Sequence, residues 1–311
     1  MTTASRVPVL MDVDTGVDDA IALATAVGTP ELELVAVSSV AGNVDVEKTT
    51  ANTLAVLAML GAPDVPVHRG ASRPLARMRR DAAHFHGADG LGESRLPVSR
   101  RGAGPDRGPA AIIRHVLARP GELTLVCVGP LTNLAIALNV APELPQLFRS
   151  VVVMGGAFFQ HGNVTPYAEF NIYADPEAAE QVFAAPFPDL IVVGLDVTEH
   201  VSISRAQWER MSNMDRDAAA LVYRICRRSF EERGAEEFHL HDPLALAVAV
   251  YPELVATKPS TIEVVTDGVE EGRTRARPGG DVSVAHAVDT LRFETWFWRA
   301  LGMDEDIAPR A

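Results

Sequence analysis

The sequence is poor in cysteine, and it has no long hydrophobic run. Cys127 and Cys226 are the two cysteines in 311 residues, too few for a disulfide framework or a thiolate zinc site, so we expect a reducing, cytoplasmic location. No stretch reaches the ~18 to 20 apolar residues that a membrane span requires. The first residues also lack the apolar core of a signal peptide. We therefore expect neither secretion nor membrane insertion.

Basic residues are scarce as well. The chain has 28 Lys and Arg against 41 Asp and Glu, a net charge of −13, and a surface of this sign repels nucleic acid unless its basic residues cluster. The arginine groups at residues 77–80 and 100–101 have no aromatic residues interleaved with them. With 47% hydrophobic residues the chain is typical of a folded globular protein. We expect no nucleic-acid partner.

Apolar runs of strand length alternate with helical patterns along the chain. The runs are rich in Val and Leu without polar alternation, which is typical of strands buried on both faces. They cover residues 7–13, 32–40, 123–128, 151–154 and 190–195. The helices expected between them cover residues 18–27, 46–60, 109–118, 131–138 and 176–184. This alternation predicts a single α/β domain over residues 1–311, with a mostly parallel open sheet flanked by helices.

The remaining segments complete this pattern. Residues 73–107 are rich in Arg, Gly, Pro and His and predict a long loop, a kind of segment that is often functional inside a compact domain. Residues 204–233 are expected to be mainly helical, and 242–251 to form another helix. A strand pair near 261–266 and 282–288 and a Trp-rich helix over 290–301 close the chain.

Four carboxylates lie within eight residues where the first strand meets the first helix: Asp12, Asp14, Asp18 and Asp19. Ligands bind at the carboxyl ends of strands in open parallel sheets. The carboxylates repel one another unless a cation lies between them, and a hard divalent ion suits oxygen ligands. Helix N-capping accounts for one or two of the four. An EF-hand loop does not fit, because Gly16 falls at the fifth position instead of the sixth.

Residues 11–23, MDVDTGVDDAIAL, resemble the N-terminal signature of the inosine-uridine-preferring nucleoside hydrolase family. Further elements follow in the family's order: Asn43, VGPLTNLA at 128–135, MGGAFFQHGNVTPYAEFNIYADPEAA at 154–179 and HDPLALA at 241–247. The resemblance spans roughly residues 7–250. Thr15 departs from it, because the family usually has proline there. The resemblance implies a Rossmann-like nucleoside-hydrolase fold and a calcium-dependent enzyme that hydrolyses the N-glycosidic bond of ribonucleosides.

The resemblance also implies the roles of individual residues. The Ca²⁺ ligands would be Asp14, Asp19, Asp242 and the backbone carbonyl of Val128, with Asp12 orienting one of them. All of these ligands are oxygen donors, as calcium prefers. Asp14 would in addition take a proton from a calcium-bound water and act as the general base.

The ribose and the leaving base have their own matching residues. The ribose hydroxyls would be held by Asp18, Asn43, Asn163, Glu169 and Asn171, with the backbone of Met154 also lining the pocket. Loss of a hydroxyl leaves such buried groups unpaired, so we expect 2′-deoxynucleosides to be poor substrates. His241 matches the family histidine that protonates or hydrogen-bonds the departing base, and the ordinary pKa of histidine suits donation near neutrality.

The resemblance also implies which residues would line the base pocket. His86 and Tyr223 match positions that line the base pocket in non-specific and pyrimidine-preferring members. Residues 84–92 and 219–240 contain no tryptophan, so the indole sandwich of the purine-specific subgroup is not expected. Whether Arg227, Arg228 or Phe230 faces the base stays open.

Other interpretations are compatible with some of these residues. One is a nucleoside-binding protein of the same fold with little turnover. Another is a phosphatase with Asp12 as nucleophile, although neither Lys48 nor Lys258 follows a strand as such an enzyme requires. The resemblance further implies a homo-oligomer, either a dimer or a tetramer.

Overall fold

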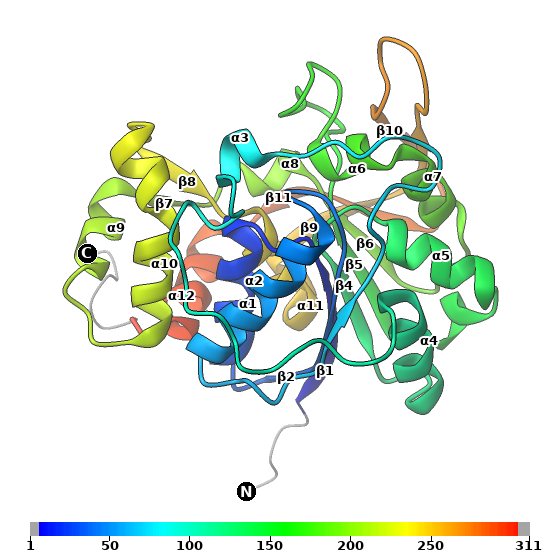
Figure 1. Cartoon of the computed structure of the whole chain (residues 1–311). Coiled ribbons are helices and arrows are strands. Elements are labelled where there is room, and N and C mark those ends of the chain that lie inside the picture. Colours follow the sequence, from blue (N-terminus) through cyan, green and yellow to red (C-terminus); the bar gives the residue numbers. More distant parts are fainter. Residues whose placement is uncertain (1–5, 304–311) are drawn as a thin grey trace, which may run out of the picture.

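The computed structural model of the protein describes residues 6–303, and its centre is a nine-stranded sheet (Figure 1). The strands are β1 (Val7–Val13), β2 (Leu32–Ser39), β3 (Val67–Arg69), β4 (Thr124–Cys127), β5 (Ser150–Met154), β6 (Leu190–Val193), β9 (Val255–Val264), β10 (Thr274–Pro278) and β11 (Val282–Val288). Their order across the sheet is β10-β9-β11-β6-β5-β4-β1-β2-β3. All neighbouring pairs are parallel except those that β9 makes with β10 and β11. The predicted mostly parallel sheet is therefore confirmed.

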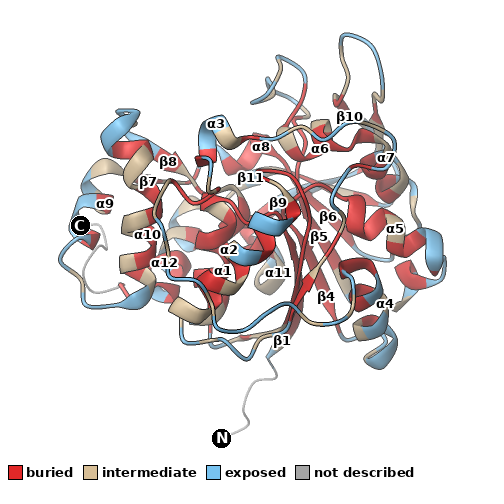
Figure 2. Ribbon diagram, viewed as in Figure 1, coloured by how far each residue is buried: buried red, intermediate tan, exposed pale blue. Residues whose placement is uncertain are grey.

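Helices cover both faces of the sheet (Figure 1). One face carries α1 (Val17–Gly28), α2 (Val46–Met59), α10 (Asp217–Arg227), α11 (His241–Val250) and α12 (Thr290–Ala300), and the other carries α4 (Gly108–Ala118), α5 (Thr132–Val140) and α7 (Pro176–Ala184). Because alternate side chains of a strand point to opposite faces, Val152 packs in the first layer and Val151 in the second. Both layers are buried along the sheet (Figure 2).

Shorter elements complete the fold. They are α3 (Ala83–His86), η1 (Leu144–Leu147), α6 (Phe170–Ala174), α8 (Leu195–Thr198), the two-stranded sheet of β7 (Ser202–Ser204) and β8 (Glu237–His239), α9 (Arg205–Met211), the π-helix η2 (Arg228–Glu232) and η3 (Pro252–Leu254). The long loop predicted for residues 73–107 contains only α3. None of the helices within residues 6–303 combines the length and the apolar character that crossing a bilayer requires.

Two predictions about strands are corrected. The run predicted as a strand over 190–195 ends at Val193, and α8 begins at Leu195. The predicted final strand pair is a three-stranded group, because β10 pairs with β9 on the side away from β11. This pairing is reinforced by charge, as Arg275 donates from Nη1 to Oε1 of Glu263 across 3.1 Å. A charged strand at the edge of a sheet, such as β10, lacks the apolar run by which a buried strand is recognised in a sequence.

Candidate active site

A cavity of about 700 Å³ opens where the parallel strands end. Asn43, Val128 and Met154 reach it from the ends of β2, β4 and β5, and Asp242 reaches it from the first turn of α11. The residues predicted for the site that line this cavity are Asp18, Asn43, His86, Val128, Met154, Asn163, Glu169, Asn171, His241 and Asp242. Segments separated by more than 200 residues in the sequence thus meet at one edge of the sheet.

Asp14 and Asp19 lie fully buried beneath the cavity. The backbone N–H of Asp14 donates to Oδ1 of Asp19 (2.9 Å), and the N–H of Gly16 donates to Oδ2 of the same carboxylate (2.9 Å). The backbone N–H of Asn43 donates to Oδ2 of Asp14 (2.7 Å), and its side-chain amide donates to Oδ2 of Asp19 (3.2 Å). Oδ1 of Asp14 is buried and has no hydrogen-bond partner among the described residues.

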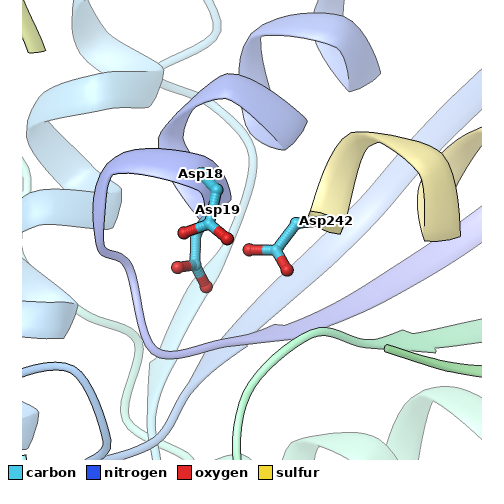
Figure 3. A group of neighbouring side chains, drawn as sticks. All are labelled: Asp18, Asp19 and Asp242. Carbon is cyan, nitrogen blue, oxygen red and sulfur yellow. The ribbon is translucent and has the colours of Figure 1, made fainter. Parts of the chain in front are cut away.

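The carboxylate of Asp19 also faces two others (Figure 3). Asp18 and Asp19 come from the first turn of α1 and Asp242 from the start of α11, and one oxygen of each lies within 4.8 Å of the others. Burial raises the pKa of Asp242 well above its usual range, and the charges of the neighbouring aspartates raise it further. Burial and the charge of Asp19 likewise raise the pKa of Asp18 to about 8. Carboxylates this close can all be ionised at neutral pH only if a cation lies between them.

The donor set fits a hard divalent cation. Burial, followed by the charge of Asp19, raises the pKa of Asp14 well above its usual range, and its free Oδ1 is an unpaired acceptor. Buried unpaired carboxylate oxygens are costly unless a metal or a donor occupies the space beside them. Of the predicted side-chain ligands, Asp19 and Asp242 belong to the group of three carboxylates that meet within 4.8 Å, and Asp14 does not.

Asn171 and Glu169 fix the wall of the cavity beside β4 and β5. The amide Nδ2 of Asn171 donates to the carbonyl of Val128 (2.9 Å) and to that of Met154 (3.2 Å). Glu169 is the N-cap of α6 and accepts the N–H groups of Asn171 (2.8 Å) and Gly156 (3.0 Å). Each carboxylate or carbonyl oxygen has a second lone pair, so these groups can still accept from a ligand in the cavity.

Two histidines line the opposite wall. Nδ1 of His86 accepts the backbone N–H of Val17 (3.1 Å), and Nδ1 of His241 lies 2.7 Å from Oγ1 of Thr198. Burial lowers the pKa of His86 to about 3 and that of His241 also to about 3, with further contributions from neighbouring histidines. A low pKa favours the neutral ring, which can still donate a hydrogen bond from one nitrogen. The leaving-group role of His241 stays a prediction.

Tyr223 and the three residues left open do not line the cavity. The ring of Tyr223 stacks on Trp208 with centroids 4.8 Å apart, and Phe230 stacks on the same indole at 4.9 Å. Arg227 pairs with Glu231 on the surface of α10, and Arg228 donates to the carbonyl of Phe85. None of the residues of α10 lines the cavity.

Asp12 is also fully buried, and it lies apart from the three facing carboxylates. Its Oδ1 accepts from Nδ2 of Asn133 (2.7 Å) and from the hydroxyl of Ser38. Asn133 in turn donates to the carbonyl of Ser39 (3.0 Å), at the end of β2. Asp12 therefore ties the ends of β1 and β2 to α5. Its backbone carbonyl also accepts the N–H of Val128 (2.9 Å), so it contacts one predicted metal ligand through the backbone.

Several cavity residues were not predicted. The aromatic pair Phe85 and Phe238, with centroids 6.2 Å apart, lines the mouth together with His239 and Arg233. The guanidinium of Arg233 lies 4.5 Å above the ring of Phe85. Phe85, in the long loop over residues 73–107, was the one sequence signal for this wall, because binding residues often lie on loops.

Comparisons with known proteins agree with this arrangement. Residues 9–295 match the family described as inosine-uridine preferring nucleoside hydrolase. The chain is 38% identical over 310 residues to the non-specific ribonucleoside hydrolase RihC of Shigella boydii, covering 96% of this chain and 99% of that one. It is 36% identical over 270 residues to uridine nucleosidase 1 of Arabidopsis thaliana, covering 85% and 80%. The solved structure of a purine-preferring ribonucleoside hydrolase from Gardnerella vaginalis superposes with a TM-score of 0.90 at 34% identity, covering 96% and 100%.

Proposed function

Because the chain belongs to the inosine-uridine preferring nucleoside hydrolase family, and is thus a hydrolase acting on the N-glycosyl bonds of ribonucleosides, we propose that Asp14 is its general base and Ca²⁺ its metal. The observation that carries this proposal is the state of the Asp14 carboxylate. Oδ2 is held by the N–H of Asn43 at 2.7 Å, while the buried Oδ1 has no partner among the described residues. A carboxylate fixed by one oxygen and free at the other is oriented to accept a proton.

The carboxylates would hold the ion together with one backbone carbonyl. Asp19 and Asp242 belong to the group of carboxylates that meet within 4.8 Å. Asp14 would add its unpaired Oδ1, and Val128 would add its carbonyl just after β4. When bound, Ca²⁺ would offset the repulsion between these groups and lower the pKa of water. An all-oxygen set from several segments favours calcium over zinc, which prefers nitrogen and sulfur ligands.

The sugar would be bound by groups that both donate and accept. Oδ1 of Asn163 accepts the N–H of Phe170 at 3.0 Å, which orients its amide N–H groups for donation to the sugar. Asp18 is half-buried at the cavity surface, and Asn43 lies beside it. Glu169 and Asn171 would contact the hydroxyls from the other wall, where the Met154 carbonyl also lies. A hydroxyl both donates and accepts, so mixed amide and carboxylate surroundings satisfy it.

The departing base would lie against His241, His86 and the aromatic pair Phe85 and Phe238. Aromatic faces bind a planar base by stacking without selecting its hydrogen-bonding edge. We therefore propose a non-specific or pyrimidine-preferring enzyme. The named activities of the relatives from Shigella boydii and Arabidopsis thaliana support this, whereas the relative from Gardnerella vaginalis prefers purines. Contact of Tyr223 with the base and assembly into a homo-oligomer stay predictions.

The test is a panel of uridine, cytidine, inosine and adenosine in phosphate-free buffer, with free ribose measured by reducing-sugar assay and free base by chromatography. We expect equal amounts of ribose and base from at least the pyrimidine nucleosides. Chelation should abolish this release and Ca²⁺ should restore it. Binding of nucleosides without release of ribose would instead support a nucleoside-binding protein of the same fold. Release of phosphate from phosphomonoesters would support the phosphatase interpretation.

A further inference from the structure

Thr198 lies next to the cavity without lining it. It is the last residue of α8, which begins two residues after β6 ends, and its side chain is fully buried. Its hydroxyl Oγ1 lies 2.7 Å from Nδ1 of His241, the histidine at the start of α11. The end of β6 therefore supports the opposite side of the imidazole from the one that faces the cavity.

The direction of this hydrogen bond follows from the surroundings of the hydroxyl. The contact with His241 is the one hydrogen bond that Thr198 Oγ1 makes within the described residues. The carbonyl of Gly194, one turn earlier, already accepts the backbone N–H groups of both Val197 and Thr198, each at 3.1 Å. A buried hydroxyl whose proton has no acceptor is costly. The hydroxyl therefore donates to Nδ1 of His241, and the ring carries its proton on Nε2.

The second histidine of the cavity has the same tautomer for an independent reason. A backbone N–H can only donate, and the N–H of Val17 points at Nδ1 of His86 across 3.1 Å. Nδ1 of His86 is therefore an acceptor, and its proton also lies on Nε2. The hydroxyl of Thr198 and the backbone N–H of Val17 thus each occupy an Nδ1 atom. Both imidazoles keep an Nε2–H group for a ligand in the cavity that both rings line.

We propose that Thr198 is a positioning residue for the leaving group, since its hydroxyl holds His241 in the tautomer that donates a hydrogen bond from Nε2 to the departing base. This inference rests on the proposed function of His241. When the bond between C1′ and the base nitrogen breaks, its electron pair stays on the base, and water adds its oxygen to C1′ while its proton passes to Asp14. The Nε2–H group stabilises the negative charge on the base without losing its proton, and the base is then protonated by solvent.

The test compares Thr198→Val, which keeps the shape but removes the hydroxyl, with Thr198→Ser, which keeps the hydroxyl. For uridine we expect kcat/KM of Thr198→Val to fall about 10- to 100-fold, the loss typical when the partner that orients a metal-ligating histidine is removed. Thr198→Ser should restore most of it. With p-nitrophenyl riboside, whose leaving group needs no hydrogen bond, the fall should stay within about threefold. Equal losses on both substrates, or no loss on uridine, would overturn the proposal.

A second comparison separates positioning from a general structural effect. In a His241→Ala background, Thr198→Val should have no further effect on uridine turnover, because the two residues act as one unit. A full additional loss would contradict the proposal.

A third measurement does not depend on any variant. In the wild-type protein, ¹⁵N NMR of the imidazole should show a protonated Nε2 and a bare Nδ1 for His241, and the reverse would overturn the assignment. If the wild-type protein released no ribose at all, the proposed function would be refuted, independently of the tautomer that NMR shows for His241.

Discussion

The close packing around Asp14 predicts the effect of adding a single methyl group at Gly42. This glycine lies in the turn after β2, and a Cβ built on it would lie 2.1 Å from Oδ2 of Asp14 and 2.8 Å from Cδ of Pro130. Its φ lies outside the left-handed region that favours glycine. The substitution Gly42→Ala therefore acts through contact with Asp14 and Pro130.

The size of the effect follows from that distance. Atoms in ordinary contact are about 3.5 Å apart, so the Asp14 carboxylate must move by more than about 1 Å. Oδ2 would then lose the 2.7 Å hydrogen bond from Asn43, and the unpaired Oδ1 would be displaced with it. A displacement of about 1 Å at a reacting group can cost about 10²-fold in rate, which corresponds to about 2.7 kcal/mol of activation free energy.

The assay is the kcat/KM of ribose release from uridine at saturating Ca²⁺. The matched control is Gly102→Ala, because a Cβ at Gly102 meets nothing within 4 Å. We expect a loss of about 10²-fold for Gly42→Ala and wild-type activity for Gly102→Ala. If Gly42→Ala kept wild-type kcat/KM and the same Ca²⁺ affinity, the position of Asp14 would not control catalysis, and the reasoning would be refuted.

Two further predictions concern the ribose and the ion. We expect 2′-deoxyuridine to be hydrolysed with a kcat/KM lower than that of uridine by about 10⁴-fold, because buried amides and carboxylates would be left unpaired, and comparable rates would show that the 2′-hydroxyl is not bound. Burial raises the pKa of Asp12 to about 7 and that of Asp18 to about 8. In the chelated protein the folded state therefore holds protons that the unfolded state has lost. The free energy of unfolding then falls as pH rises from about 4 to about 8. Added Ca²⁺ should therefore raise Tm by an amount that grows over this range, and a Ca²⁺ effect on Tm that is independent of pH would contradict it.

The parallel part of the fold could be predicted because its strands are continuous apolar runs. Residues 151–154 are all buried, and a strand covered on both faces has no polar alternation. The edge of the sheet gave no such signal, since β10 has the sequence TRARP and pairs with β9 partly through Arg275 and Glu263. The short strands β3, β7 and β8 were missed because three residues carry too little pattern.

The candidate site could be predicted where its residues lie close in sequence or in quoted motifs, as Asp18 and Asp19 do. Contacts between segments far apart in the sequence could not be predicted in this way. Thr198 and His241 are 43 residues apart, and nothing in either segment specifies that a hydroxyl and an imidazole meet. Tyr223 was predicted to line the base pocket, and its ring stacks on Trp208 instead. Helical periodicity does not decide between these two directions.

The central claim is that the Asp14 carboxylate takes the proton from the attacking water. The most direct measurement is the kcat of ribose release by Asp14→Ala, with Asp281→Ala as a control for loss of one exposed carboxylate outside the cavity. We expect Asp14→Ala to lose at least about 10³-fold in kcat, because general base catalysis and the position of the ion depend on it, and Asp281→Ala to retain wild-type kcat. A folded Asp14→Ala protein that releases ribose within about tenfold of the wild-type rate would contradict the account.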